Sequence, residues 1–223
     1  MISKTNIRSL SVEALRSFLT SIGENVFRTQ QIYDWRWHKG IDEVKAIYNL
    51  PKRLREQLGA FFSLHTVQPN YHHQSIDGRI KYAMRLYDGN LIESVLIPTE
   101  KQSTAYISSQ IGYSLGCKFC AKAQLPRMRN LQFGKIYDQV RLLDRYSREQ
   151  FGRPLNNVVF MGMSEPFFNY PNVIQAIKKI TTAKGYIFRH GASIYRPHIS
   201  RKLSEDLPMI NRSSNSPCLC TRP

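Results

Sequence analysis

The side chains best suited to chemistry in this chain are four cysteines, which occur as two close pairs. Cys117 and Cys120 form a CxxC pair, and Cys218 and Cys220 form a CxC pair near the end of the sequence. A CxxC pair alone is typical of half a zinc site, of a redox pair, or of two small buried side chains. No second pair has the spacing that a zinc ribbon needs, and the pattern is not that of a disulfide framework. The cysteines therefore indicate a reducing compartment, and we expect a cytoplasmic protein.

The net charge indicates a polyanionic partner. The sequence has 32 Lys and Arg against 16 Asp and Glu, which gives a formal charge of +16 and a pI near 9.9. The excess is largest in residues 121–188, which carry 11 basic and 4 acidic side chains. A local excess of this kind is typical of nucleic-acid binding, and a solvated basic surface is the alternative.

Composition and hydropathy argue against two classes of protein. Hydrophobic residues at 42% and aromatic residues at 11% are sufficient for a buried core, so we do not expect a disordered chain. No run of 18 apolar residues occurs, and residues 1–6 lack the apolar stretch of a secretory signal. We therefore expect no membrane partner.

The elements that would position these residues begin with short amphipathic helices in the first sixty residues. Ser11 is suited to cap a helix that ends at Gly23, because apolar residues recur between them at helical spacing. A second helix is predicted over 29–39. Asp42 is the predicted cap of a third, whose inward residues would be Val44, Ile47 and Tyr48.

The hydrophobic period changes to two near residue 80. Residues 81–87 and 91–97 alternate between apolar and polar side chains, and Asp88-Gly89-Asn90 supplies turn residues between them. This pattern predicts a β-hairpin. His72 and His73, just before it, are assigned to a loop as solvated histidines rather than metal ligands.

The following segment alternates strands with helices. Strands are predicted over 105–109 and 157–161, and helices over 133–149 and 171–182. This order implies βαβ units and a parallel sheet, whose sites lie at the carboxyl ends of the strands. The cysteine loop and the loop 162–166 both follow predicted strands. We therefore expect them to share one rim of the sheet.

The residues around the first cysteine pair resemble the CxxxCxxC loop of radical S-adenosylmethionine (SAM) enzymes. More narrowly, the chain resembles the ribosomal-RNA adenine methyltransferases of the RlmN and Cfr type, from Ile7 to about Phe188. The motifs that carry the resemblance are FRTQQIYDW at 27–35, IESVLIP at 92–98, SSQIGYSLGCKFC at 108–120, RMRNL at 127–131 and VVFMGMSEP at 158–166. Several independent motifs in family order make this match specific.

The resemblance implies a [4Fe–4S] cluster, held by three thiolates, that binds SAM and cleaves it to a radical. The electron would come from a donor such as flavodoxin or ferredoxin. The implied substrate is an adenine of 23S rRNA, methylated at carbon 2 by the RlmN type and at carbon 8 by the Cfr type. Transfer RNA is a further substrate of some RlmN-type enzymes. Carbon 2 is our main prediction, although the motifs do not distinguish the two.

The family's site residues carry over to five positions of this sequence. Cys117 and Cys120 match the second and third cluster ligands. Ser164 and Glu165 match the Gly-Glu pair that holds the methionine end of SAM. Glu93 matches the proton acceptor, although without the resemblance it would be read as an ordinary charged strand residue.

Three positions depart from the family pattern. Tyr113 occupies the place of the first cluster cysteine, and Tyr106 occupies the place of the cysteine that resolves the protein–RNA adduct. Ser164 replaces a glycine where backbone approaches the cofactor. The sequence also ends before the family's methyl-carrying cysteine. We therefore expect catalysis by this copy to be impaired, and the alternative is a non-catalytic RNA-binding remnant.

The expected fold is α/β, with a small N-terminal helical domain, a β-hairpin linker, and the first part of a truncated, partial (β/α) radical-SAM barrel. The boundaries are 1–65 for the helical RNA-binding-type domain, 66–100 for the linker, 101–188 for the barrel and 189–223 for a tail. We interpret the tail as frame-shifted sequence, because a one-base shift of its codons permits family-like strands. We expect it to lack packed structure, and Cys218 and Cys220 to be accidental.

Overall fold

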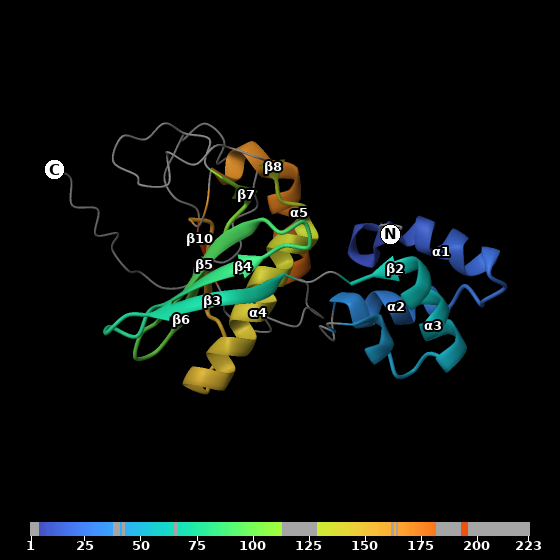
Figure 1. The fold of residues 1–223 in the computed structure, drawn as a ribbon, viewed down its shortest axis with the longest axis horizontal. Coiled ribbons are helices and arrows are strands. Elements are labelled where there is room, and N and C mark those ends of the chain that lie inside the picture. Colours follow the sequence, from blue (N-terminus) through green and yellow to red (C-terminus); the bar gives the residue numbers. More distant parts are fainter. Residues whose placement is uncertain are drawn as a thin grey trace.

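The computed structural model of the chain describes residues 5–37, 41, 43–64, 67–112, 129–161, 163, 165–181 and 193–195. Within these ranges the structure has a helical N-terminal part, a mixed β-sheet and two helices that cover one face of the sheet (Figure 1). The mixed α/β character of the prediction is therefore confirmed. Among the described residues, no helix combines the length and apolar character needed to cross a bilayer.

The N-terminal part consists of short helices around its own small core. Its elements are β1 (Thr5–Asn6), η1 (Ile7–Ser9), α1 (Val12–Ser21), α2 (Arg28–Trp37), η2 (Val44–Ala46), α3 (Lys52–Phe61) and β2 (Phe62–Ser63), with β1 parallel to β2. The predicted cap of the first helix is confirmed, because the Ser11 hydroxyl accepts a hydrogen bond from the Ala14 amide at 3.0 Å. Leu15, Leu19, Ile32, Leu54 and Leu58 are the most deeply buried of the apolar side chains that form the core.

The third predicted helix is wrong in two respects. Only a 3₁₀ turn, η2, forms there, and the next α-helix begins after Pro51, which is its N-cap residue. Val44 and Ile47 are buried as expected, but Tyr48 is 75% exposed and contacts the Trp35 ring at its edge. A single 3₁₀ turn cannot place all three side chains inward. Asp42, the proposed cap, lies outside the described residues.

The sheet has six strands in the order β10-β9-β6-β5-β4-β3. The strands are β3 (Gln68–Gln74), β4 (Ile80–Arg85), β5 (Leu91–Pro98), β6 (Ser103–Tyr106), β9 (Asn157–Val159) and β10 (Ser193–Tyr195). Neighbours from β3 to β6 are antiparallel, whereas β6, β9 and β10 are parallel. The predicted hairpin is β4–β5, and β5 is hydrogen-bonded to β6. The segment expected as a linker therefore lies in the same sheet as the strands expected to begin the barrel. Residues 193–195 of the expected tail pair with β9, so the expectation of no packed structure is wrong for these three residues.

Sequence reasoning missed strand β3 altogether. His72 and His73, assigned to a loop, lie within this strand at the edge of the sheet. All seven residues of β3 are exposed, so no alternation of buried and exposed side chains marks the strand in the sequence. Pairing with β4 is what makes it a strand.

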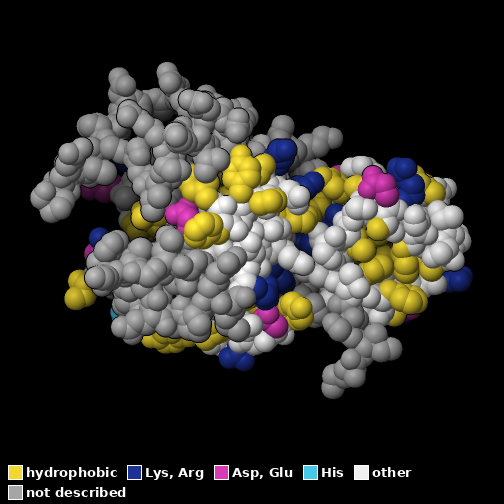
Figure 2. Space-filling model, turned by 90° about the horizontal axis from the view of Figure 1, so that it is seen from above, with side chains coloured by type: hydrophobic (Ala, Val, Ile, Leu, Met, Phe, Trp, Pro, Cys, Tyr) yellow, Lys and Arg dark blue, Asp and Glu magenta, His cyan; other side chains and the backbone are white. Residues whose placement is uncertain are grey.

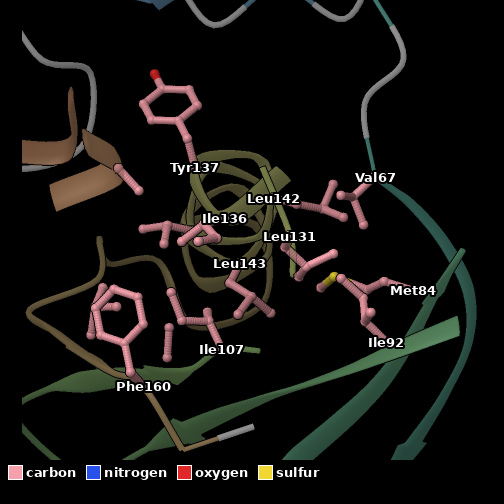
Figure 3. Packing of buried hydrophobic residues seen from close by; sticks show 14 of the residues in the cluster. Val67, Met84, Ile92, Ile107, Leu131, Ile136, Tyr137, Leu142, Leu143 and Phe160 are labelled. Carbon is pink, nitrogen blue, oxygen red and sulfur yellow. The ribbon is translucent and has the colours of Figure 1, made fainter. Parts of the chain in front are cut away.

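Helices α4 (Phe133–Phe151) and α5 (Tyr170–Thr181) cover one face of the sheet. Both agree with the predicted helices at 133–149 and 171–182. Alternating side chains of β4 and β5, such as Met84 and Ile92, point toward α4 and form the larger core with Leu143 (Figure 3). The opposite face of the sheet carries the other set of alternating side chains.

The N-terminal part is joined to α4 by Trp37, which is 1% exposed and belongs to the larger core. Its ring stacks on Phe133 with centroids 5.5 Å apart and meets Tyr137 edge-on at 5.1 Å. The Tyr137 hydroxyl donates a hydrogen bond to the Trp37 carbonyl oxygen at 2.6 Å. Beside it, the buried Arg8 guanidinium forms an ion pair with Asp138. The helical part and the sheet part therefore share buried structure.

Candidate functional site

The sheet face turned away from α4 and α5 carries the candidate site. Strand register places Ala83 opposite Glu93, and it aligns Lys81, Val95 and Tyr106 across three neighbouring strands. Because side chains alternate along a strand, these five lie on the same face. All are partly or fully exposed, in contrast to their buried neighbours in sequence.

Glu93 lies in a hollow on this face. Its carboxylate Oε2 is 2.7 Å from the Lys81 Nζ, and the Glu93 side chain is only 19% exposed. The hollow has a volume of about 300 Å³, and its lining residues are Tyr71, His73, Lys81, Ala83, Leu91, Ile92, Glu93 and Met163. A carboxylate in a partly enclosed hollow is suited to accept a hydrogen bond from a polar group of a ligand. The ion pair and the low exposure distinguish the environment of Glu93 from that of an ordinary solvent-exposed charged residue on a strand.

The Ser108 hydroxyl links Glu93 to the loop that contains Met163. It donates a hydrogen bond to the Glu93 carbonyl oxygen at 2.6 Å and accepts one from the Met163 amide at 2.7 Å. The next residue, Ser109, donates its amide to the Met163 carbonyl oxygen at 3.4 Å. The segment that leads into the cysteine loop therefore lies beside the 162–166 loop, and the predicted common rim is confirmed at these described residues.

Gln139 of α4 holds Ser108 in place. The Ser108 amide donates to the Gln139 Oε1 at 2.9 Å, and the Gln139 Nε2 donates to the Ser108 carbonyl oxygen at 3.0 Å. The Ser94 hydroxyl also donates to Oε1, at 2.9 Å. All three residues are fully buried, so each hydrogen bond satisfies a polar group that water does not reach. Sequence reasoning missed this network; its one local signal was a glutamine on the apolar side of a helix, between Ile136 and Leu143.

The two ends of the cysteine loop are held together. β7 (Gln110–Ile111) pairs antiparallel with β8 (Arg129–Asn130). The buried Asn169 amide group donates to the carbonyl oxygens of Ser109 at 2.6 Å and of Leu131 at 2.7 Å. The residues on both sides of the loop are thus fixed against the sheet rim. Tyr113, Cys117 and Cys120 themselves lie outside the described residues.

Glu165 follows the loop at the start of η4 (Pro166–Asn169). Its side chain is buried, and its Oε1 accepts a hydrogen bond from the Phe167 amide at 3.3 Å. This contact caps the short helix and fixes the position of the carboxylate. Ser164, the other residue matched to SAM binding, lies outside the described residues.

The donor set in the sequence does not fit a cluster held by three thiolates. Cys117 and Cys120 supply two thiolates, and Tyr113 supplies a phenol at the place of the first cluster ligand. A phenol is protonated at neutral pH, and its oxygen is a harder and bulkier donor than a thiolate. Among the described residues, no group of three or more His, Cys, Asp or Glu side chains is arranged to hold a metal.

A second hollow lies in the N-terminal part, between η2 and α3. Its volume is about 260 Å³, and Lys45, Lys52, Arg55 and Glu56 line it. The Arg55 Nη1 donates to the Lys45 carbonyl oxygen at 3.0 Å, which fixes the guanidinium at the wall. Three cations around one hollow, with the exposed ring of Tyr48 on η2's C-terminal side, are suited to phosphate and sugar groups.

Comparison with known proteins gives a consistent set of matches. Residues 5–64 match the family model of the ribosomal RNA large subunit methyltransferase N-terminal domain. The chain is 48% identical over 184 residues to a probable dual-specificity RNA methyltransferase RlmN of Flavobacterium psychrophilum. This alignment covers 82% of this chain and 53% of the relative. It is 35% identical over 211 residues to a dual-specificity RNA methyltransferase RlmN of Anaeromyxobacter dehalogenans, with 93% and 55% covered.

A solved structure agrees with these matches. The crystal structure of a radical SAM methyltransferase from Sphaerobacter thermophilus matches with a TM-score of 0.71 and 34% identity, over 81% of this chain and 53% of that chain. The chain therefore spans about half the length of the curated relatives and of the solved structure that it matches.

Proposed function

The chain belongs to the RlmN type of radical SAM RNA methyltransferases, and on that premise we propose that it binds 23S ribosomal RNA, with transfer RNA as a second class of ligand. The relatives are named as dual-specificity RNA methyltransferases, which supports both classes. The proposed nucleobase is an adenine, with carbon 2 as the reacting position of the type. The proposed location is the cytoplasm.

The observation that carries the proposal is the shared rim. Ser108 joins the strand that bears Glu93 to the loop before Glu165 by hydrogen bonds of 2.6 and 2.7 Å. A base-modifying enzyme needs its proton acceptor and its cofactor loop beside one another, at the end of the strands. In this proposal Glu93 faces the adenine, Lys81 keeps the Glu93 carboxylate in position, and Glu165 is the residue that would hold the methionine end of SAM if SAM were bound.

We further propose that this copy binds RNA without completing the methylation. Tyr113 leaves the cluster loop with Cys117 and Cys120 as its only thiolates, which does not fit a cluster with three protein ligands. We therefore derive no step through a cluster. The [4Fe–4S] cluster, the bound SAM and an electron donor such as flavodoxin or ferredoxin belong to the relatives' reaction in this proposal.

The charges support an RNA ligand. The chain carries a formal charge of +16, and Lys and Arg side chains are spread over the face drawn in Figure 2. The hollow with Lys45, Lys52 and Arg55 would contact phosphates, which position an RNA without reading its sequence. Unpaired bases would then lie on the open sheet face near Glu93.

The experiment has two arms, both on the full chain. In the first, fluorescence anisotropy with an adenine-containing 23S rRNA hairpin should give saturable binding that weakens steeply between about 50 and 200 mM salt. Lys52→Glu should weaken binding and reduce the salt dependence, whereas the exposed Glu13→Gln on α1 should not. Absence of saturable binding at low salt would refute the RNA proposal.

In the second arm, anaerobic reconstitution with iron and sulfide compares the wild-type chain with Tyr113→Cys and Tyr113→Ser. We expect cluster absorbance only for Tyr113→Cys, because only this change supplies a third thiolate. The serine variant controls for the removal of the phenol ring. Stoichiometric cluster absorbance in the wild-type chain, with cleavage of SAM, would contradict the proposal that this copy is inactive.

A further inference from the structure

Edge strand β3 carries a local irregularity that changes which face its residues occupy. Pro69 lies opposite Met84, but Tyr71 lies opposite Ala83, so Asn70 is an extra residue in the strand. The Arg85 Nη2 donates to the Asn70 Oδ1 at 2.7 Å, which holds the bulged residue to β4. A bulge of this type turns the following side chains by one register position.

The consequence concerns Tyr71. In a regular strand Tyr71 would face Tyr82, on the side covered by α4. With the bulge, it lies instead on the face turned away from α4, in line with Ala83 and Glu93, and His73 lies in line with Lys81. Bulges next to functional sites commonly have this effect of redirecting one side chain.

Tyr71 and His73 then form one wall of the hollow that contains Glu93. Tyr71 is 61% exposed, and the apolar Leu91 beside it is also exposed. The opposite side has Met163 of the loop at the sheet rim. The hollow thus combines aromatic rings, an apolar floor, one cation and one carboxylate. A ligand with a flat ring, apolar on its faces and polar at its edges, would be complementary to this combination of side chains.

We infer that Tyr71, together with His73, is a stacking platform for one unpaired nucleobase of the bound RNA, beside Glu93. The inference rests on the proposed RNA binding and identifies the surface on which a base lies. Unpaired bases are commonly bound by stacking on aromatic side chains of a sheet surface. Lys81, whose side chain is 56% exposed, stands beside the platform, where the phosphate next to the stacked base would pass.

The composition of β3 and β4 agrees with this ligand. Lys81 lines the hollow and, although paired with Glu93, its half-exposed ammonium group can also approach an anion. An exposed tyrosine and leucine on that same surface favour an apolar group. A nucleotide supplies both, since its base is apolar on its faces and its phosphate is negative.

The test uses the full-length chain and an RNA hairpin with 2-aminopurine in place of one unpaired adenine. Stacking on an aromatic side chain changes the fluorescence of 2-aminopurine. The variants are Tyr71→Ala, Tyr71→Phe and, as a matched control, Tyr87→Ala. Tyr87 is 63% exposed, lies between β4 and β5 and does not line the hollow. Thermal unfolding of each variant shows whether it is folded.

We expect Tyr71→Ala to raise the Kd by about 5- to 150-fold, the range typical of a lost base–aromatic stack, and to abolish the fluorescence change. The slope of log Kd against log salt should stay the same, because tyrosine carries no charge. Tyr71→Phe and Tyr87→Ala should behave as wild type. Unchanged Kd and fluorescence change in a folded Tyr71→Ala would overturn the inference while leaving RNA binding intact. Absence of RNA binding by the wild-type chain would overturn both.

Discussion

Replacing Trp37 by alanine tests whether the helical part and the sheet part fold as one unit. Trp37 is 1% exposed, and it makes two aromatic contacts with α4, at 5.5 Å to Phe133 and 5.1 Å to Tyr137. Removing a fully buried tryptophan typically costs about 3–5 kcal/mol. Two aromatic pairs at about 0.5–1.5 kcal/mol each are part of that loss. We therefore expect the free energy of unfolding to fall by about 4 kcal/mol.

Trp35 is the matched control, two residues earlier on the same helix. It is only partly buried at the edge of the smaller core, and its ring meets that of the exposed Tyr48 edge-on at 5.7 Å. Trp35→Ala should therefore cost about 1–2 kcal/mol. The two variants have the same chemistry and differ in which core they affect.

The assay is urea unfolding followed by circular dichroism and by fluorescence of the remaining tryptophan. For the wild-type chain the two probes should report one transition, because the parts share a buried junction. For Trp37→Ala, the fluorescence of Trp35 reports the helical part alone. Circular dichroism reports the helices of both parts, so it should show a second transition that the fluorescence lacks. A loss below about 1 kcal/mol with coincident transitions would refute the view that Trp37 couples the parts.

Two further predictions concern groups inside the sheet part. Gln139→Leu should lower the free energy of unfolding by about 2–5 kcal/mol in urea unfolding, because the Ser108 amide and the Ser94 hydroxyl lose their acceptor inside the core. The control is Gln150→Leu, at an exposed position at the other end of α4. An equal loss of stability in both variants would contradict the reasoning. Burial, and then the nearby Arg8, lower the pKa of Lys135 from 10.5 to about 8. The folded chain therefore binds fewer protons than the unfolded chain between these values, so stability should rise from pH 8 toward pH 10, by up to about 1.4 kcal/mol per unit. Below about pH 8 Lys135 is protonated in both states, and its contribution should level off at its lowest value. Lys135→Met should flatten this rise in unfolding measured across the pH range, and an unchanged slope would count against the buried cation.

The local sequence pattern was sufficient to predict those helices and strands that are specified by residues within one segment. The α1 cap at Ser11, the two helices over the sheet and the β4–β5 hairpin all follow from spacing and turn residues within one segment. The common rim also followed from local pattern, because parallel strands align their carboxyl ends. The family motifs proposed Glu93 and Glu165 as site residues, and both lie close to the contacts that Ser108 makes at that rim.

Tertiary structure alone decided the features that depend on distant partners. Strand β3 has no buried face, so its sequence lacks the period of two, and only pairing with β4 defines it. The bulge at Asn70, and with it the face on which Tyr71 lies, arises from that same pairing. No rule of local periodicity detects an extra residue between two strands.

The hydrogen-bond network of Ser94, Ser108 and Gln139 also depends on tertiary structure. Ser108 and Gln139 are 31 residues apart and meet only because α4 packs on the sheet. Trp37 lies in the predicted second helix, but nothing in that segment indicates that it packs against α4 and belongs to the larger core. A sequence specifies which side chains are apolar and which turns are favourable, because these depend on neighbouring residues. The sequence does not specify which groups become hydrogen-bond partners in the core. A buried polar group must have a partner, but the tertiary packing determines which residue that partner is.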